Sequence, residues 1–254
     1  MWGRTFVRAL RELISGDTDA AERFATDALA IGTEGGQPDA STIFGAQLMV
    51  VSGQRGNMSD LIPLIEKLAA ETPDISPWLF GSLLAKAHVE ADRTGEALRH
   101  LDAFAAAGFD LALDQVWLTG MVDYAEAAIG CRSRAHAEPL YRRLLPWADQ
   151  VPATGASALP PVSQYLGGLA TVLDDYESAD NHFAHAGQMS HRMHATFFCA
   201  SNDLLWGRMY LARGQSGDPE RARVLLQSAK SVAASHGYAN VERRATTLLQ
   251  TIEG

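Results

Sequence analysis

The chain has few of the residues that cross-link small folds. Among its 254 residues there are only two cysteines, Cys131 and Cys199, and they form no Cys-x-x-Cys pair. A disulfide scaffold is therefore excluded, and we expect both thiols to be buried small side chains in a reducing compartment. No run approaches the ~18 apolar residues of a membrane helix. A signal peptide is not indicated either. These absences predict a cytoplasmic protein without a membrane contact.

Positive charge is also scarce. The chain has 21 Lys and Arg against 30 Asp and Glu, a net charge of −9, and only three of the basic residues are lysines. A surface that binds nucleic acid usually carries a basic stripe, so direct nucleic-acid binding is not expected. Hydrophobic residues make up 47% of the chain, which excludes a disordered protein.

Motifs for catalysis are missing. The chain contains neither the G-x-x-x-x-G-K-[ST] loop that cradles phosphates nor the G-x-S-x-G nucleophile elbow. Its adjacent carboxylates, such as Asp174 and Asp175, occupy turn sequences where helix capping explains them. We therefore predict no enzymatic activity and no cofactor.

What the chain does have is a repeated anchor of three apolar or small residues, spaced four and then three apart. Successive anchors begin 40, 36, 40, 42 and 43 residues apart, which is the spacing of a helical-repeat array. The six anchors are Ala21-Ala25-Ala28, Leu61-Ile65-Leu68, Ala97-Leu101-Phe104, Ala137-Tyr141-Leu144, Ala179-Phe183-Ala186 and Ala222-Leu226-Ala229.

Two-residue alternation is nearly absent, and helix breaks are well marked, for example at Gly16-Asp17-Thr18 and Gly217-Asp218-Pro219. The predicted fold is all-α: a tetratricopeptide-like α-solenoid of about six helical hairpins and a C-terminal capping helix near residues 241–252. We assign residues 1–254 to one helical-repeat domain. Residues 149–162, which include three prolines, form either a long loop or a hinge, and the loop is favoured because the anchor spacing barely changes across them.

Two repeats resemble the tetratricopeptide motif closely. A small residue in the first helix lets the second approach, and an aromatic residue or leucine fills the gap. The first of these repeats carries Leu166, Gly167, Ala179, Phe183 and Ala186, and the second carries Trp206, Gly207, Tyr210, Ala222, Leu226 and Ala229.

A further resemblance covers residues 137–245. The segments AEPLY (137–141), LLPWAD (144–149), YLGGLA (165–170) and GDPERA (217–222), in this order, resemble the C-terminal helical-repeat region of multidomain bacterial signalling ATPases of the adenylate cyclase/LuxR-type regulator family. The Arg-rich composition suits an actinobacterial member. The resemblance implies a regulatory region attached to an ATPase, cyclase or DNA-binding module. None of the motifs of those modules can be placed in this chain, so their activities are not carried over.

Half of the eight histidines fall within residues 182–194. His182 and His185 share a helix face, and a zinc site would need them to converge with His191, His194 or Cys199. The alternative is that these histidines cap a helix end or respond to pH.

The leading functional hypothesis is a non-catalytic regulatory domain. It would bind a protein segment or small-molecule signal in a concave groove and control an ATPase, a cyclase or a transcription-regulator module. Such a domain is expected to be part of a larger signalling polypeptide or to bind a separate one. Two alternatives remain open: a stand-alone adaptor for protein assembly, and a metal-binding sensor or enzyme that uses the histidine cluster.

Overall fold

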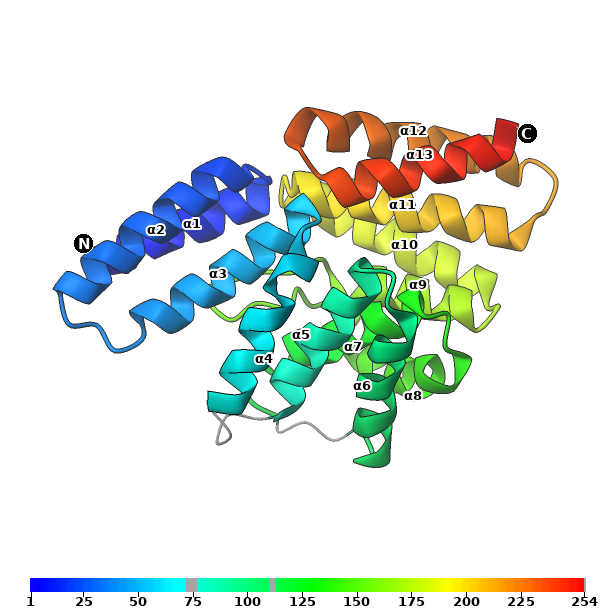
Figure 1. Cartoon of the computed structure of the whole chain (residues 1–254). Helices are drawn as coiled ribbons and strands as arrows, with labels where there is room; N and C mark the ends of the chain where they lie inside the picture. Colours follow the sequence, from blue (N-terminus) through cyan, green and yellow to red (C-terminus); the bar gives the residue numbers. More distant parts are fainter. Residues whose placement is uncertain (72–76, 110–112, 254) are drawn as a thin grey trace.

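The computed structural model describes residues 1–71, 77–109 and 113–253, and they form an all-α protein (Figure 1). The predicted all-α class is thus confirmed. Within the described part, the helices are α1 (Trp2–Ser15), α2 (Thr18–Glu34), α3 (Ala40–Arg55), α4 (Ile62–Glu71), α5 (Pro77–Glu90), α6 (Thr94–Ala106), α7 (Trp117–Gly130), α8 (Arg134–Leu144), α9 (Val162–Val172), α10 (Tyr176–Arg192), α11 (Thr196–Arg213), α12 (Asp218–His236) and α13 (Ala239–Glu253), with short 3-10 helices η1 (Met58–Leu61) and η2 (Leu145–Trp147).

The helices follow one another as antiparallel pairs, and the pairs are arranged in two layers. From α5 to α13 the odd-numbered helices contact one another in succession, while the even-numbered helices lie against their odd neighbours. The odd helices therefore form the inner layer. Helix α9 is its most enclosed member, because every residue from Val162 to Ala170 is buried. Helix α12 buries only the stripe of Ala222, Leu226, Ala229 and Ala233, as expected for an outer helix.

Glycines set the close approach of the two helices in the C-terminal pairs. A Cβ atom at Gly167 would lie 2.8 Å from the Phe183 ring, and one at Gly207 would lie 2.8 Å from the Leu226 side chain. Both anchors are completely buried, with Ala179, Phe183, Ala186, Ala222, Leu226 and Ala229 all at 0% exposure. Leu166 is also fully buried, and Tyr210 is 6% exposed. The small residue and the large residue thus occupy complementary positions on facing helices.

The N-terminal helices contact the C-terminal helices. Helix α1 contacts α11, and α3 contacts α13 (Figure 1). The left-handed glycines that end α1 and α3 make this approach possible. The Gly16 carbonyl accepts a 2.9 Å hydrogen bond from the Tyr238 hydroxyl, and a Cβ atom at Gly56 would lie 2.6 Å from that of Asn240. The first helices therefore pack against the last ones.

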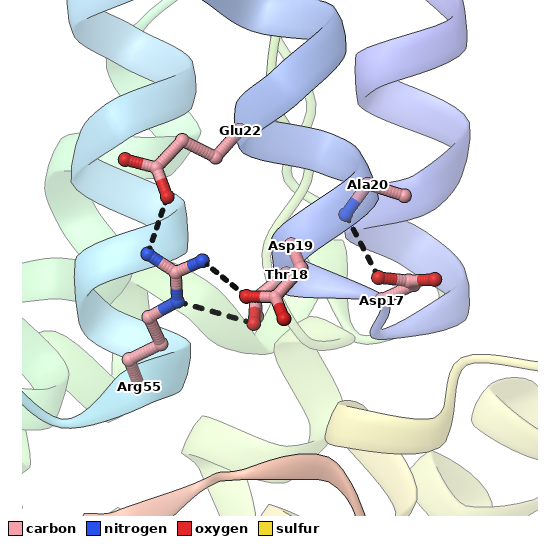
Figure 2. A network of polar contacts seen from close by, with 6 residues as sticks. All are labelled: Asp17, Thr18, Asp19, Ala20, Glu22 and Arg55. Carbon is pink, nitrogen blue, oxygen red and sulfur yellow. Dashed lines mark hydrogen bonds and ion pairs between the residues drawn. The ribbon is translucent and has the colours of Figure 1, made fainter.

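Helices α2 and α3 are joined by a polar network around Arg55 (Figure 2). Its guanidinium lies 2.7 Å from the Asp19 carboxylate and 2.6 Å from that of Glu22, and it also donates to the Thr18 hydroxyl. The Asp17 carboxylate accepts from the Ala20 N–H, which gives α2 the N-cap that the sequence predicts. The acidic first turn of α2 thus faces the basic last turn of α3, in the sense that the helix dipoles favour.

Only part of the segment 149–162 is buried, and its first residues, Asp149 and Gln150, are exposed. Residues 156–162 are buried, and the segment has one isolated bridge, between Ala153 and Ala158. Ala158 packs with Phe198 of α11 and with Leu10 of α1. The Ala156 carbonyl accepts a hydrogen bond from the Gln47 side chain. This loop therefore fills the space between the first helices and the last ones.

None of the described helices combines the length and apolarity needed to cross a membrane. Both cysteines are free and only partly buried, so the prediction that both are buried side chains was wrong. Cys131 directly follows α7 and Cys199 lies in the first turn of α11, where neighbouring turns cover only one side of a residue. Burial, together with the Asp203 carboxylate, raises the pKa of Cys199 to about 11, so this thiol is not activated.

Candidate functional site

Five of the charged side chains on the inner layer are grouped here as the inner charged cluster: Lys86, Asp123, Glu126, Arg208 and Arg244. They come from α5, α7, α11 and α13, all of them inner helices. The Lys86 ammonium lies 3.0 Å from the Glu126 carboxylate and 3.3 Å from that of Asp123. The side chain of Lys86 is 15% exposed and that of Asp123 only 6%. The ion pair is thus shielded from water on one side and reaches solvent through Glu126, which is 42% exposed.

At the centre of this cluster one ammonium group faces two carboxyl groups, so negative charge is in excess there when both are ionised. Burial raises the pKa of Asp123 to about 6, with Lys86 opposing and Glu126 adding to the rise. Burial lowers the pKa of Lys86, but the two carboxylates outweigh it and hold that pKa well above its ordinary value. Lys86 is therefore always protonated near neutral pH, whereas Asp123 is close to its titration point.

Tyr165 of α9 closes the cluster on a third side. Its ring is 2% exposed, and burial raises its pKa well above the ordinary value of 10.0, with Glu126 acting in the same direction. The cluster thus has an acidic centre next to a neutral phenol on α9, which is buried from Val162 to Ala170.

The basic side of the cluster is built by α11 and α13. Arg208 donates a 3.2 Å hydrogen bond to the carbonyl of Ile129, near the C-terminal end of α7. Burial lowers the pKa of Arg208 to about 10, and the charges of Arg244 and Arg132 act in the same direction. Burial also lowers the pKa of Arg244, with Glu126 opposing. Glu126 thus lies within electrostatic reach of both Lys86 and Arg244, and it connects the two sides.

The structure separates the histidines that the sequence places close together. The His182 ring lies 2.9 Å from the Tyr141 hydroxyl, and His185 lies 2.9 Å from the Asp149 carboxylate. His191 lies 3.8 Å from the Cys199 sulfur, while His194 occupies the turn after α10 with a positive φ of 54°. In the described part of the chain, no three His, Cys, Asp or Glu side chains could share a metal ion. Of the candidates His182, His185, His191, His194 and Cys199, only His191 and Cys199 contact each other, so the described structure does not gather the donor set that a zinc site would need.

The residues that resemble the tetratricopeptide motif in the sequence pack between neighbouring helices. Trp206 also makes a polar contact. The Trp206 indole and the Tyr210 hydroxyl each donate 2.7 Å hydrogen bonds to the Asp180 carboxylate. Trp206 also stacks on Phe183, with the ring centroids 6.5 Å apart. This network joins α10 to α11 and holds the inner layer in place.

The inner charged cluster was not predicted from the sequence, although part of its signal is visible there. Asp123 and Glu126 interrupt the otherwise apolar segment WLTGMVDYAEAAIG, and Lys86 interrupts the apolar segment PWLFGSLLAKAHVE. Charges within apolar helices indicate buried pairs, because an unpaired charge there is costly. Arg208 and Arg244 give no such signal, since they lie on helices with many other polar residues.

Comparisons of this chain with protein families, with curated protein sequences and with solved structures found no match. The inner charged cluster is thus the basis on which a function can be argued. Its groups can pair with a charged ligand and orient it.

Proposed function

We propose that this chain is a regulatory helical-repeat domain of the tetratricopeptide-like type, located in the cytoplasm. It binds a protein segment or a small-molecule signal on its inner layer and controls an ATPase, a cyclase or a transcription-regulator module. The succession of helix pairs and the glycine contacts at Gly167 and Gly207 support the repeat assignment. The resemblance of residues 137–245 to signalling ATPases supports the regulatory role.

The observation that carries this proposal is the inner charged cluster. Charged groups taken out of water lose solvation energy, and well-packed apolar side chains in their place are often at least as stable. Groups with shifted pKa values also gather at functional sites. The burial of Asp123, which raises its pKa to about 6, lowers the stability of the folded protein. Recognition of a charged ligand explains why such a loss of stability is kept.

The chemistry of the cluster favours binding over catalysis. A lysine acts as a nucleophile or base only when it loses its proton near neutral pH. The carboxylates of Asp123 and Glu126 have the opposite effect on Lys86, whose pKa is held high. The cluster therefore serves as a fixed arrangement of charges that a ligand can complement.

Affinity capture from the source cell tests this proposal with a matched pair of variants. Glu126→Gln alters the inner layer, and Glu138→Gln alters an exposed glutamate on the outer helix α8 that pairs with Arg142. We expect the wild type and Glu138→Gln to retain a protein that contains an ATPase, cyclase or DNA-binding module. Retention on Glu126→Gln should be at least about ten-fold lower. Equal retention on both variants, or no module-bearing protein on the wild type, would contradict the proposal.

An immunoblot of the source cell separates regulation within one polypeptide from the adaptor alternative. A native product of about the 27.4 kDa of this chain favours a stand-alone adaptor. A product several times larger places the repeats and the effector module in one polypeptide. In that case the same two substitutions are made in the long protein, and the activity of its module is measured directly.

A further inference from the structure

Two histidine rings stack on each other where α6 packs against α5. The rings of His88, near the C-terminal end of α5, and His100 on α6 have centroids 5.7 Å apart, and their planes are inclined by 17°. His88 is only 5% exposed, and His100 is partly buried. Neither residue belongs to the inner charged cluster or to the histidines of residues 182–194, so the proposed function leaves this contact unexplained.

The surroundings of His88 suit a neutral ring. Its Nδ1 is buried and has no hydrogen-bond partner among the described residues. A neutral imidazole tolerates this position, because one of its two nitrogens carries no proton. Protonation would place an N–H donor and a positive charge at a buried site without an acceptor, beside a second ring that takes up a proton in the same pH range.

The charged groups around His88 do not compensate for a proton there. They are Glu66 on α4, Arg93 in the turn after α5, and Glu96 and Arg99 on α6. Two carboxylates thus oppose two guanidinium groups, and the Glu96 carboxylate itself lies 3.7 Å from Arg99. Burial therefore lowers the pKa of His88, and burial together with the charge of His88 lowers the pKa of His100.

The charges on the other elements packed against α5 have partners of their own or act elsewhere. On α7 the carboxylates of Asp123 and Glu126 pair with Lys86. The acidic residue of η1 is Asp60, and the backbone of η1 donates a 3.3 Å hydrogen bond to Glu90 of α5. In the part of the chain that the structure describes, neither stacked ring lies within ion-pair distance of a carboxylate, whereas two other histidines do, at 3.2 and 2.9 Å.

We propose that the His88–His100 stack is a pH-sensitive contact, which holds α6 on α5 while both rings are neutral and releases α6 when His88 takes up a proton. This regulatory property goes beyond the proposed function and requires no ligand. Release would uncover the anchor of α6, whose residues Ala97, Leu101 and Phe104 are fully buried. With α6 open, His88 regains the ordinary histidine pKa of 6.5, so opening becomes more favourable as the pH falls through that value.

Hydrogen exchange at about pH 7.5 and about pH 5.5, corrected for the intrinsic pH dependence of amide exchange, tests the proposal. We expect the α6 amides of the wild type to exchange about three-fold to ten-fold faster at the lower pH. Ten-fold is the upper limit, because a free histidine at pH 5.5 is protonated about ten times more often than it is neutral. His88→Phe keeps a flat ring in the stack but takes up no proton, so this acceleration should be absent.

The matched control is His236→Phe, which replaces an exposed histidine that stacks on Tyr238 with the ring centroids 5.5 Å apart. It should show the wild-type response. Protonation of Asp123 over the same pH interval favours the folded state, because its pKa is raised, but this effect is common to all three proteins. The difference between the wild type and His88→Phe therefore isolates the histidine.

Two results would overturn the proposal. One is the same pH response of the α6 amides in the wild type and in His88→Phe. The other is an acid-induced acceleration that is equal in every helix, which would mean that the whole fold opens and not α6. Should His88→Phe fail to fold, His88→Gln takes its place, because its neutral side chain does not titrate either.

Discussion

The helices from α9 to α13 and those from α1 to α3 are held together by different interactions. The C-terminal group packs large side chains such as Phe183, Leu226 and Tyr238 into one extended core. The N-terminal group has a core of Leu13, Ala21 and Val51. Its remaining buried positions are mostly alanine or polar, and its cohesion depends on hydrogen bonds and ion pairs.

Two glutamines show how polar groups replace packing in the N-terminal group. The Gln47 amide donates to the carbonyls of Phe6 and Ala156, and the Gln54 amide donates to the carbonyl of Leu13. Each such bond contributes only about 1 kcal/mol net. A buried Leu or Phe contributes roughly 1.5–3 kcal/mol. The comparison teaches that the C-terminal group can act as the rigid frame of the inner layer, whereas the N-terminal group is the more weakly attached part.

The largest expected effect comes from a substitution in the C-terminal group of helices. Phe183→Ala removes a fully buried ring that fills the space at Gly167 and should destabilise the protein by about 3–5 kcal/mol. Val51→Ala in the N-terminal core should cost roughly 2 kcal/mol. Hydrogen exchange measures where protection is lost. We expect loss throughout α9–α12 for Phe183→Ala and only within α1–α3 for Val51→Ala. The same pattern of loss in both variants would show that the two groups unfold as one.

The next effect concerns Asp123, a buried charged residue on α7, which lies outside both groups. The folded-state pKa of Asp123, about 6, lies above its ordinary value of 3.8, so ionisation of this group costs stability as the pH rises through that interval. Asp123→Asn should therefore stabilise the protein by up to about 3 kcal/mol at pH 7 to 8. The gain should disappear at about pH 3, below the ordinary pKa of 3.8, where wild-type Asp123 is mostly protonated in both states. Urea midpoints at the two pH values measure it, and a gain that does not vary with pH would contradict the assignment.

A smaller pair of changes compares glycines from the two groups. An added methyl at Gly167 would meet the Phe183 ring at 2.8 Å, so Gly167→Ala should cost about 1–3 kcal/mol. Gly45 lies inside α3 with no atom within 4 Å of the added methyl. Gly45→Ala should therefore stabilise by about 0.5–1 kcal/mol through helix propensity. Thermal melts show whether each variant is more or less stable than the wild type. A destabilising Gly45→Ala would mean that α3 is packed as tightly as α9.

The smallest effect tests the attachment between the groups. Tyr238→Phe removes the hydroxyl that donates to the Gly16 carbonyl and should cost about 1 kcal/mol, since it also leaves a buried carbonyl unpaired. Hydrogen exchange in α1 and α2 should accelerate while exchange in α9 and α10 stays unchanged. Tyr176→Phe is the matched control, because its hydroxyl is exposed and makes long contacts. Equal effects from both variants would show that the Gly16 contact does not hold the N-terminal group.

The sequence by itself determined the helical class and most helix boundaries, because these depend on local features. The Asp17 cap precedes α2 and the left-handed glycines Gly16 and Gly56 end α1 and α3, all within a turn of the residues they act on. Most anchor residues were recognisable as buried for the same reason, since a helical stripe is defined within about ten residues, whereas Leu61, Leu68 and Tyr141 are only partly buried. Fold class, pairing of neighbouring helices and the packing stripe are therefore readable along the chain.

Only the tertiary structure decided where the ends of the array meet and where the site lies. Tyr238 reaches Gly16 across more than two hundred residues, and Lys86, Asp123, Arg208 and Arg244 come from four helices. Contacts between residues so far apart in the sequence depend on how all the intervening helices pack, so nothing local to Arg208, Arg244 or Tyr238 marks the neighbours that each of them has in the fold.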